Sequence, residues 1–360
     1  MKSLFDSVNL AGMSVKNRLI RSATYEGMAN QQGHLTQDLF QLYEDLAKGE
    51  AGIIITSVTA VSPREKWIPW QLGIDNDSFI EEYKKLTDTV HEYGAKIIMQ
   101  IGAIGAQTMD DNNPDRAMKG PSAVTDIGYG TTPLTLEQEE ILAFEEEFAA
   151  AAWRAKQAGF DGVQVHAAHG YLLSKFLTPY YNLRADQYGG SIENRSRFLV
   201  ETFQRIRERV GVDYPILLKI NADDFMEDGM SFEECKYVCQ KLQIFGLSAV
   251  ELSGGSRSSR QGEGYSRPNP RVHSYFFSYA KELQQEVAVP VIAVGGNRDF
   301  VAVTNLLNES EIDFFSFARP LIRERNLFSR WKSGDTAPAL CISCNRCSKF
   351  GNNHCIFNEK

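Results

Sequence analysis

Two imidazoles and a phenol lie within six residues of one another, at His166, His169 and Tyr171. Imidazoles can donate hydrogen bonds to a substrate oxygen, and a phenol can deliver a proton. Together these groups suit a reaction in which an activated double bond is polarised and then protonated. Two alternatives stay open. Either histidine could merely satisfy backbone groups in a loop, or the pair could bind a metal, although no carboxylate or cysteine lies close in sequence to complete such a set.

Glycines or a cation follow three apolar runs in the second half of the sequence: Gly254, the pair Gly295 and Gly296, and Ala318 with Arg319. Glycines at such positions let backbone N–H groups approach a phosphate, and an arginine adds a charge-assisted contact. Glycine pairs are also common in simple turns. Lys219 ends another apolar run and would place a cation at the mouth of the same cavity, since a buried lysine is otherwise costly.

Four cysteines crowd into the last twenty residues with the spacing C-x2-C-x2-C-x7-C: Cys341, Cys344, Cys347 and Cys355. Four thiolates are the right number for a [4Fe-4S] cluster or a structural zinc, and unliganded thiols are the third alternative. Cys235 and Cys239 lie one helical turn apart and are expected to be packing residues. This layout favours metal or nothing over a disulfide framework.

The elements that must position these residues are eight short apolar runs bounded by Gly, Pro or Asp: 18–23, 52–58, 96–101, 162–166, 215–221, 248–253, 290–295 and 312–318. Segments with helical periodicity lie between them: 38–49, 78–93, 135–159, 193–210, 231–246, 274–287 and 298–308. Thr135 with Gln138, and Ser231 with Glu234, fit a capping box at two helix starts.

Strands this apolar require burial on both faces, and a helix follows nearly every one. The pattern therefore predicts a (β/α)8 barrel, with the active site at the carboxyl ends of the strands. A doubly wound open sheet is the main alternative, and the absence of a G-x-G-x-x-G motif after the first strand disfavours it. We expect the barrel to occupy residues 1–335 and a Cys-rich tail, packed on or near it, to occupy 336–360. The long irregular segments 102–133 and 254–272 are predicted to be functional loops.

The chain of 360 residues carries 38 Lys and Arg against 46 Asp and Glu, a net charge of −8. This balance disfavours nucleic acid and anionic membranes as partners. No apolar run has the length of a signal peptide or of a membrane span, so a cytoplasmic location is predicted. The oligomeric state is left open.

The segment 166–198, HAAHGYLLSKFLTPYYNLRADQYGGSIENRSRF, resembles the signature block of the Old Yellow Enzyme family. The resemblance begins near Leu4 and extends through the FARPLI segment at 317–322, so it covers almost the whole barrel. It implies a (β/α)8 fold that binds FMN, which NADH or NADPH reduces and which passes hydride to an alkene conjugated with a carbonyl or nitro group.

The resemblance also implies roles by position. It places beside the flavin ring, or at its edges, the residues Ala23, Thr24, Val58, Gln100 and Lys219. It assigns to the ribityl chain and phosphate Gly254, Gly295, Gly296, Ala318 and Arg319. His166 and His169 would bind the activating oxygen of the substrate, and Tyr171 would protonate the carbon next to it.

Three departures from the family pattern concern the site. Lys219 stands where many members have Arg, which keeps the charge but loses the fork geometry. The run after Gln100 lacks the His and Arg of many relatives, so the substrate pocket is expected to differ. The cysteines resemble the cluster-binding segment of the 2,4-dienoyl-CoA reductase and trimethylamine dehydrogenase group, but with shorter spacings. Those relatives continue into a nucleotide-binding region, whereas this sequence stops at Lys360, so a cluster here is expected to lack a built-in electron donor.

The leading hypothesis is therefore an FMN-dependent ene-reductase with NAD(P)H and a small activated alkene as its partners. One alternative is a non-redox barrel enzyme that acts on a phosphorylated substrate with Lys219 as base or Schiff-base former. Another is an iron-sulfur electron-transfer flavoprotein or metal-binding protein in which the cysteine tail matters most. The fold alone does not choose among them.

Overall fold

The computed structural model describes residues 1–66, 68, 70–108, 117–264, 272–347 and 354–358. Its centre is a closed parallel barrel of eight strands: β3 (Leu19–Arg21), β4 (Ile53–Ile55), β6 (Lys96–Gly102), β9 (Gly162–Ala167), β10 (Ile216–Asn221), β11 (Ala249–Ser253), β12 (Val291–Ala293) and β13 (Phe314–Phe317). The ring closes because β3 pairs with both β13 and β4, and β4 pairs in turn with β6. The predicted (β/α)8 barrel is confirmed, and the open sheet is excluded.

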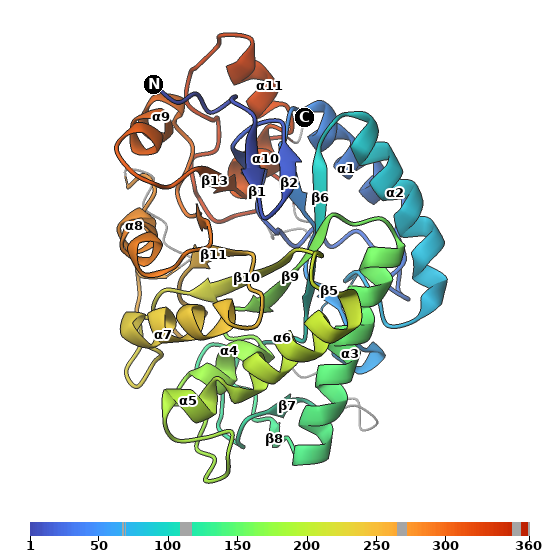
Figure 1. Cartoon of the computed structure of the whole chain (residues 1–360), viewed down its shortest axis with the longest axis vertical. Coiled ribbons are helices and arrows are strands. Elements are labelled where there is room, and N and C mark those ends of the chain that lie inside the picture. The colour runs from blue at the N-terminus through green and yellow to red at the C-terminus, as the bar shows by residue number, and fades with distance from the viewer. Residues whose placement is uncertain (67, 69, 109–116, 265–271, 348–353, 359–360) are drawn as a thin grey trace.

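Helices surround the barrel (Figure 1). The longer ones are α1 (Gln37–Lys48), α2 (Ile80–Glu92), α3 (Gln138–Gln157), α6 (Arg197–Val210), α7 (Phe232–Gln243), α8 (Phe277–Glu286) and α9 (Phe300–Asn308). Short elements are α4 (Leu172–Leu177), α5 (Ile192–Arg195), α10 (Arg319–Arg323), α11 (Leu327–Lys332), the 3-10 turns Pro63–Glu65 and Asp77–Phe79, and the strands β5 (Thr59–Ala60), β7 (Lys119–Gly120) and β8 (Leu134–Thr135). None of the helices in the described ranges is both long and apolar enough to cross a membrane.

One of the two predicted capping boxes is confirmed and the other is wrong. Ser231 and Glu234 exchange bonds at the start of α7 as expected. The box at α3 is formed instead by Glu137 and Glu140. Thr135 does not cap a helix because it pairs with Gly120 in the short β7–β8 ladder, which keeps its backbone extended.

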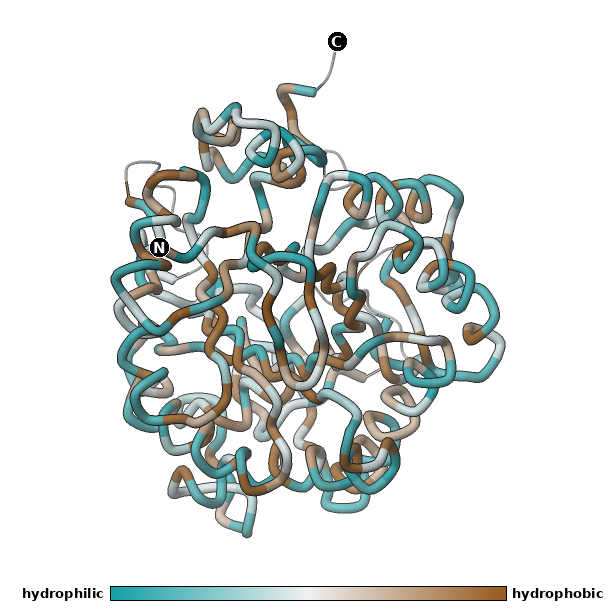
Figure 2. The backbone as a smooth tube through the Cα atoms, turned by 45° about the horizontal axis from the view of Figure 1, so that its top comes forward, coloured by the Kyte–Doolittle hydropathy of each residue, from teal (hydrophilic) through white to brown (hydrophobic). Residues whose placement is uncertain are grey.

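The N-terminal end of the barrel is sealed by an antiparallel hairpin, β1 (Val8–Leu10) and β2 (Met13–Val15). Its inward side chains join the lowest layer of barrel residues in one apolar cluster: Leu10, Met13, Val15, Ile20, Ile53, Ile55, Ile98, Leu217, Ala249, Ile292 and Phe314. Burial of each large aliphatic side chain contributes about 1.5–3 kcal/mol. Figure 2 shows hydrophobic residues gathered toward the centre of the molecule. Among the described residues, apolar side chains therefore fill the barrel at this end.

The described part of the Cys-rich tail lies against the last barrel elements. The Ala339 N–H donates to the Arg298 carbonyl at 2.8 Å, and the Trp331 indole N–H donates to the Ala337 carbonyl at 2.9 Å. Asn358 donates to the Arg323 carbonyl at 3.2 Å. The boundary at residue 335 stays a prediction.

One buried carboxyl between α3 and α6 gives a test of the packing there. Burial, together with the neighbouring Glu201, raises the pKa of Glu145 to about 8. Glu145 therefore binds more protons in the folded than in the unfolded state between its ordinary pKa and about 8, and the folded state loses stability as pH rises through that window. We expect Glu145→Gln to raise the free energy of unfolding by about 1–3 kcal/mol at pH ~8 and to change it little at pH ~4, as measured in urea.

The matched control is Glu146→Gln, because the Glu146 side chain lies on the same helix and is 56% exposed. Equal pH dependence in the two variants would contradict the assignment.

Candidate active site

A cavity of about 470 Å³ opens at the carboxyl ends of the barrel strands. The residues predicted for catalysis or flavin binding line it together: Ala23, Thr24, Val58, Gln100, His166, His169, Tyr171, Lys219, Gly295, Gly296, Ala318 and Arg319. Each comes from a strand or from the turn directly after it, because parallel strands of a barrel end on the same face. Gly254 is the exception.

Gly254 is not among the residues that line the cavity. A Cβ at this position would stand 2.7 Å from the Phe225 ring and 2.8 Å from the Phe276 ring. The close approach of these two rings accounts for a glycine here, and a role in flavin binding stays a prediction.

His169 is fixed by contacts on both its backbone and its ring. Its N–H donates to Asn221 Oδ1 at 3.2 Å, and its Nε2 lies 2.7 Å from Ser253 Oγ. Its backbone has φ +60°, an unusual conformation for a non-glycine residue, which the following Gly170 at φ +79° continues. This turn brings the His169 ring within 5.3 Å of the His166 ring, measured between centroids.

His166 is held in the tautomer that can donate toward a ligand. The Ala168 N–H donates to His166 Nδ1 at 3.2 Å, so a neutral ring carries its proton on Nε2. Burial lowers the pKa of His166 well below its ordinary value, with His169 and Lys219 adding to the effect. Burial and Lys219 likewise lower the pKa of His169 to about 3. Both imidazoles are therefore neutral at neutral pH and act as hydrogen-bonding groups, not as charges. The Tyr171 ring lies 4.5 Å from that of His166.

A polar network fills the barrel beneath the cavity, centred on Glu251. Its carboxylate accepts from Ser22 and Ser316, each at 2.6 Å, and from Gln164 at 2.9 Å. Lys219 Nζ stands 3.2 Å from the same carboxylate.

Burial alone would raise the pKa of Glu251, but the Lys219 charge and these hydrogen bonds outweigh it and lower the pKa. Gln164 in turn accepts from the Gln100 amide at 2.7 Å. Lys219 is thus buried and ion-paired, with Gln100 and Lys219 both held in place.

Sequence reasoning missed the central residue of this network. Glu251 is a single carboxylate within the apolar run 248–253, and Gln164 is a single amide within 162–166. A polar residue inside an otherwise apolar strand is the signal that could have found both, since such a group needs a buried partner.

A second group of polar residues lies beside Arg319, which follows the end of β13. Arg319 donates to the Tyr275 hydroxyl at 3.3 Å and also to Asn345. Gly295 and Gly296 have φ +100° and +79°, and a Cβ on either would meet the Tyr275 ring at 2.7–2.8 Å. Further cavity residues that the sequence did not indicate are Tyr25, Gln107, Tyr129, Arg257, Phe276, Asn297, Arg298 and Ser343.

The donor set fits a phosphorylated flavin. Amide and ammonium groups of Gln100 and Lys219 face the cavity on one side, and the cations Arg298 and Arg319 line it on another. No Asp or Glu is among the residues that line it in the described part of the chain. An anionic phosphate therefore meets only favourable charge there.

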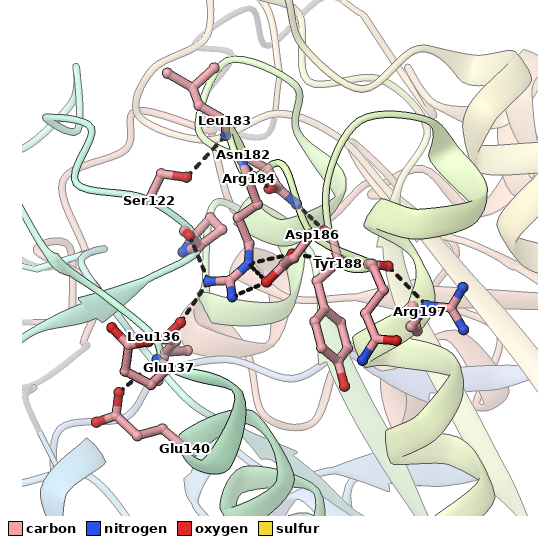
Figure 3. Close-up of polar contacts among 12 residues, drawn as sticks. Ser122, Leu136, Glu137, Glu140, Asn182, Leu183, Arg184, Asp186, Tyr188 and Arg197 are labelled. Atoms are coloured by element: carbon pink, nitrogen blue, oxygen red, sulfur yellow. Dashed lines mark hydrogen bonds and ion pairs between the residues drawn. The ribbon is translucent and has the colours of Figure 1, made fainter.

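The signature block also has a structural role. Arg184 donates to the Pro121 and Leu136 carbonyls at 3.1 and 2.6 Å and pairs with Asp186 (Figure 3). Leu183 N–H donates to Ser122 Oγ at 3.0 Å. These contacts tie the block to the loop at residues 117–133, so part of the motif's length serves to position that loop.

The cysteines form no recognisable metal site. Across the described ranges, no group of three or more His, Cys, Asp or Glu side chains is arranged to hold a metal ion. Cys347 lines the cavity. The structure thus gives no support to the predicted cluster or zinc at Cys341, Cys344, Cys347 and Cys355. Cys235 and Cys239 are fully buried, which confirms them as packing residues.

Comparison with known proteins decides the family. Residues 3–337 match the NADH:flavin oxidoreductase / NADH oxidase family. The chain belongs to this family. Membership confirms the predicted resemblance to Old Yellow Enzyme, and it implies FMN as the bound flavin and NAD(P)H as the reductant.

Other members of the NADH:flavin oxidoreductase family resemble the chain to different extents. An NADH oxidase from Thermoanaerobacter brockii is 35% identical over 345 residues, which are 95% of this chain and 53% of the relative. An NADPH dehydrogenase from Bacillus subtilis (strain 168) is 30% identical over 324 residues, 90% of this chain and 92% of the relative. The chain thus spans about half the length of some curated relatives, the NADH oxidase among them, and nearly all of others.

A structure of a morphinone reductase variant in complex with tetrahydroNAD superposes with a TM-score of 0.79. It is 28% identical and the match covers 94% of this chain and 92% of that one. The barrel fold is therefore shared over more than nine-tenths of both chains.

Proposed function

We propose that the protein is an FMN-dependent oxidoreductase of the ene-reductase type, which uses NAD(P)H to reduce an alkene activated by a carbonyl or nitro group. The observation that carries this proposal is the placement of neutral His166, neutral His169 and Tyr171 in the same cavity as the cations suited to a flavin phosphate. Neutral donors suit a carbonyl oxygen, which gains negative charge as the alkene accepts hydride.

Each residue has a part in this proposal. FMN, when bound, supplies hydride to the alkene. His166 Nε2–H donates to the activating oxygen, and His169 shares that oxygen from the neighbouring position. Tyr171 then gives its phenolic proton to the carbon next to the carbonyl.

The flavin would be held as the family resemblance implies. Ala23, Thr24 and Val58 would pack beside the ring, with Gln100 and Lys219 at its polar edges. The ribityl and phosphate groups would lie against the remaining predicted residues, Gly254, Gly295, Gly296, Ala318 and Arg319. Support comes from the cavity that all of these residues except Gly254 line, and from the network that fixes Gln100 and Lys219.

The alternatives have less support. A Schiff-base role for Lys219 requires a free amine, but its Nζ pairs with Glu251. An electron-transfer role would need metal at the tail, and among the described residues no group of side chains is arranged to hold one. Because NAD(P)H is a metabolite of the cell interior, the cytoplasmic location belongs to this proposal as well.

The deciding experiment is the visible spectrum of protein purified without air, followed by assay of acid-released flavin, iron and zinc. We expect a yellow protein that releases FMN, is bleached by NADH or NADPH, and is reoxidised by cyclohexenone. About four irons with broad brown absorbance would add a cluster to the proposal. A colourless protein that FMN cannot reconstitute would overturn it.

A further inference from the structure

The cavity has more positive charge than a flavin phosphate needs. Four of the described residues that line it are Lys or Arg: Lys219, Arg257, Arg298 and Arg319. Lys219 is balanced by Glu251, while Arg298 and Arg319 follow β12 and β13, where the phosphate is expected. Arg257 has neither of these roles.

Arg257 lies toward the side of the barrel that carries the catalytic candidates. Its guanidinium carbon stands 4.5 Å from the centroid of the Tyr129 ring. Tyr129 belongs to the segment between β6 and β9, and β9 carries His166. In the order of the closed barrel, β6 and β9 are opposite β12 and β13. Arg257 is therefore held on the substrate side of the cavity, away from the predicted phosphate site.

The contact with Tyr129 orients the arginine. A guanidinium over an aromatic face is stabilised by cation–π attraction, and its N–H edge stays available. That edge matches the two oxygens of a carboxylate or the oxygens of a phosphate. Gly128 permits this approach, because a Cβ there would stand 2.5 Å from Arg257 Cβ. Among the described residues, no carboxylate forms an ion pair with Arg257.

The loop beneath the arginine is anchored rather than free. Asp126 pairs with Lys175 of α4 at 2.5 Å, and both side chains are at most 1% exposed. The Tyr129 N–H donates to Asp126 Oδ1 at 2.7 Å. Tyr181 joins the two loops, since its hydroxyl accepts from the Ile127 N–H at 3.2 Å and lies 2.7 Å from Ser258 Oγ. Such preorganisation reduces the entropy lost when a ligand binds.

We propose that Arg257, stacked on Tyr129, binds an anionic group of the substrate, so that the enzyme prefers activated alkenes that carry a carboxylate. The inference rests on the proposed function, because it names the substrate class of the same site. Direct binding measurements separate the two.

The test compares Arg257→Gln and Arg257→Lys with a matched control, Arg260→Gln. Arg260 lies three residues further along the same loop, pairs with Glu263 at 2.8 Å and does not line the cavity. The substrates are a cyclohexenone that bears a ring carboxylate opposite its carbonyl and the methyl ester of the same acid. The ratio of kcat/KM for acid and ester, relative to the unsubstituted enzyme, cancels the intrinsic difference in reactivity.

We expect this ratio to fall by about 10- to 100-fold in Arg257→Gln, mainly through KM, and to stay unchanged in Arg260→Gln. The acid-to-ester ratio should fall less in Arg257→Lys, since the positive charge remains but the planar guanidinium that stacks on Tyr129 does not. An unchanged ratio in Arg257→Gln would overturn the proposal.

Two further measurements identify the source of the anion. If Arg257→Gln instead slows flavin reduction by NADH or NADPH and leaves the acid-to-ester ratio intact, the residue serves the dinucleotide phosphates, and the proposal fails. Calorimetric binding of para-hydroxybenzoate and its methyl ester needs no turnover. If Arg257→Gln binds the acid more weakly but binds the ester as before, the anion site is supported. If, in addition, the unsubstituted enzyme reduces no enone, the proposed function is overturned while the anion site stands.

Discussion

Tyr171→Phe is expected to slow alkene reduction by at least about 100-fold, while reduction of the flavin by NAD(P)H stays nearly unchanged. In the proposed reaction the phenol of Tyr171 is the proton donor. Its ring lies 4.5 Å from that of His166, measured between centroids, and Phe keeps the ring but not the proton. The two half-reactions are measured separately by stopped-flow absorbance of the flavin, first with NAD(P)H and then with cyclohexenone.

The control is Tyr188→Phe, because the Tyr188 hydroxyl bonds to Glu201 at 2.9 Å and does not line the cavity. Were both half-reactions to slow together in Tyr171→Phe, the role of Tyr171 would be in binding or positioning and not in proton transfer.

Glu251→Gln should destabilise the fold by about 3–5 kcal/mol and weaken retention of FMN. The Glu251 side chain is fully buried, so the substitution would leave the Lys219 ammonium inside the barrel without its counter-charge. In either orientation of the Gln amide its NH2 group would face donors, either Ser22 and Ser316 or Gln164 and Lys219. The free energy of unfolding in urea and the flavin content of the purified protein are the measurements.

A second variant separates charge from packing. Adding Lys219→Met to Glu251→Gln removes the uncompensated ammonium and should recover part of the stability, but not the flavin. Glu263→Gln, on the loop that carries Arg260, is the control and should change stability by about 0.5 kcal/mol or less. Wild-type stability in Glu251→Gln would show that Lys219 does not depend on this carboxylate.

The sequence alone was enough to predict the barrel. All eight predicted strands occur at their predicted places, because buried parallel strands are apolar along their whole length and need no long-range information to be recognised. The predicted capping box at the start of α3 is wrong. The β7–β8 ladder, a contact between residues distant in sequence, overrides the local capping pattern around Thr135.

The site was predictable only where it is built from strand ends. His166, Lys219 and Arg319 follow or end apolar runs, so their convergence follows from the barrel itself. Tyr129 and Arg257 could not be found in this way, since they lie on irregular loops. Their meeting depends on tertiary contacts, such as the buried pair of Asp126 and Lys175, that no local pattern specifies.

The hairpin that seals the N-terminal end of the barrel also determines from which end ligands can enter and leave. Because Leu10, Met13 and Val15 close that end with apolar packing, the described part of the barrel is a blind well with its mouth at the carboxyl ends of the strands. In the proposed reaction, the reductant and the alkene both reach the flavin in this cavity, so they must use the same opening. Each has to leave before the other can enter, so the architecture itself imposes alternation on the proposed reaction and makes each ligand a competitor of the other.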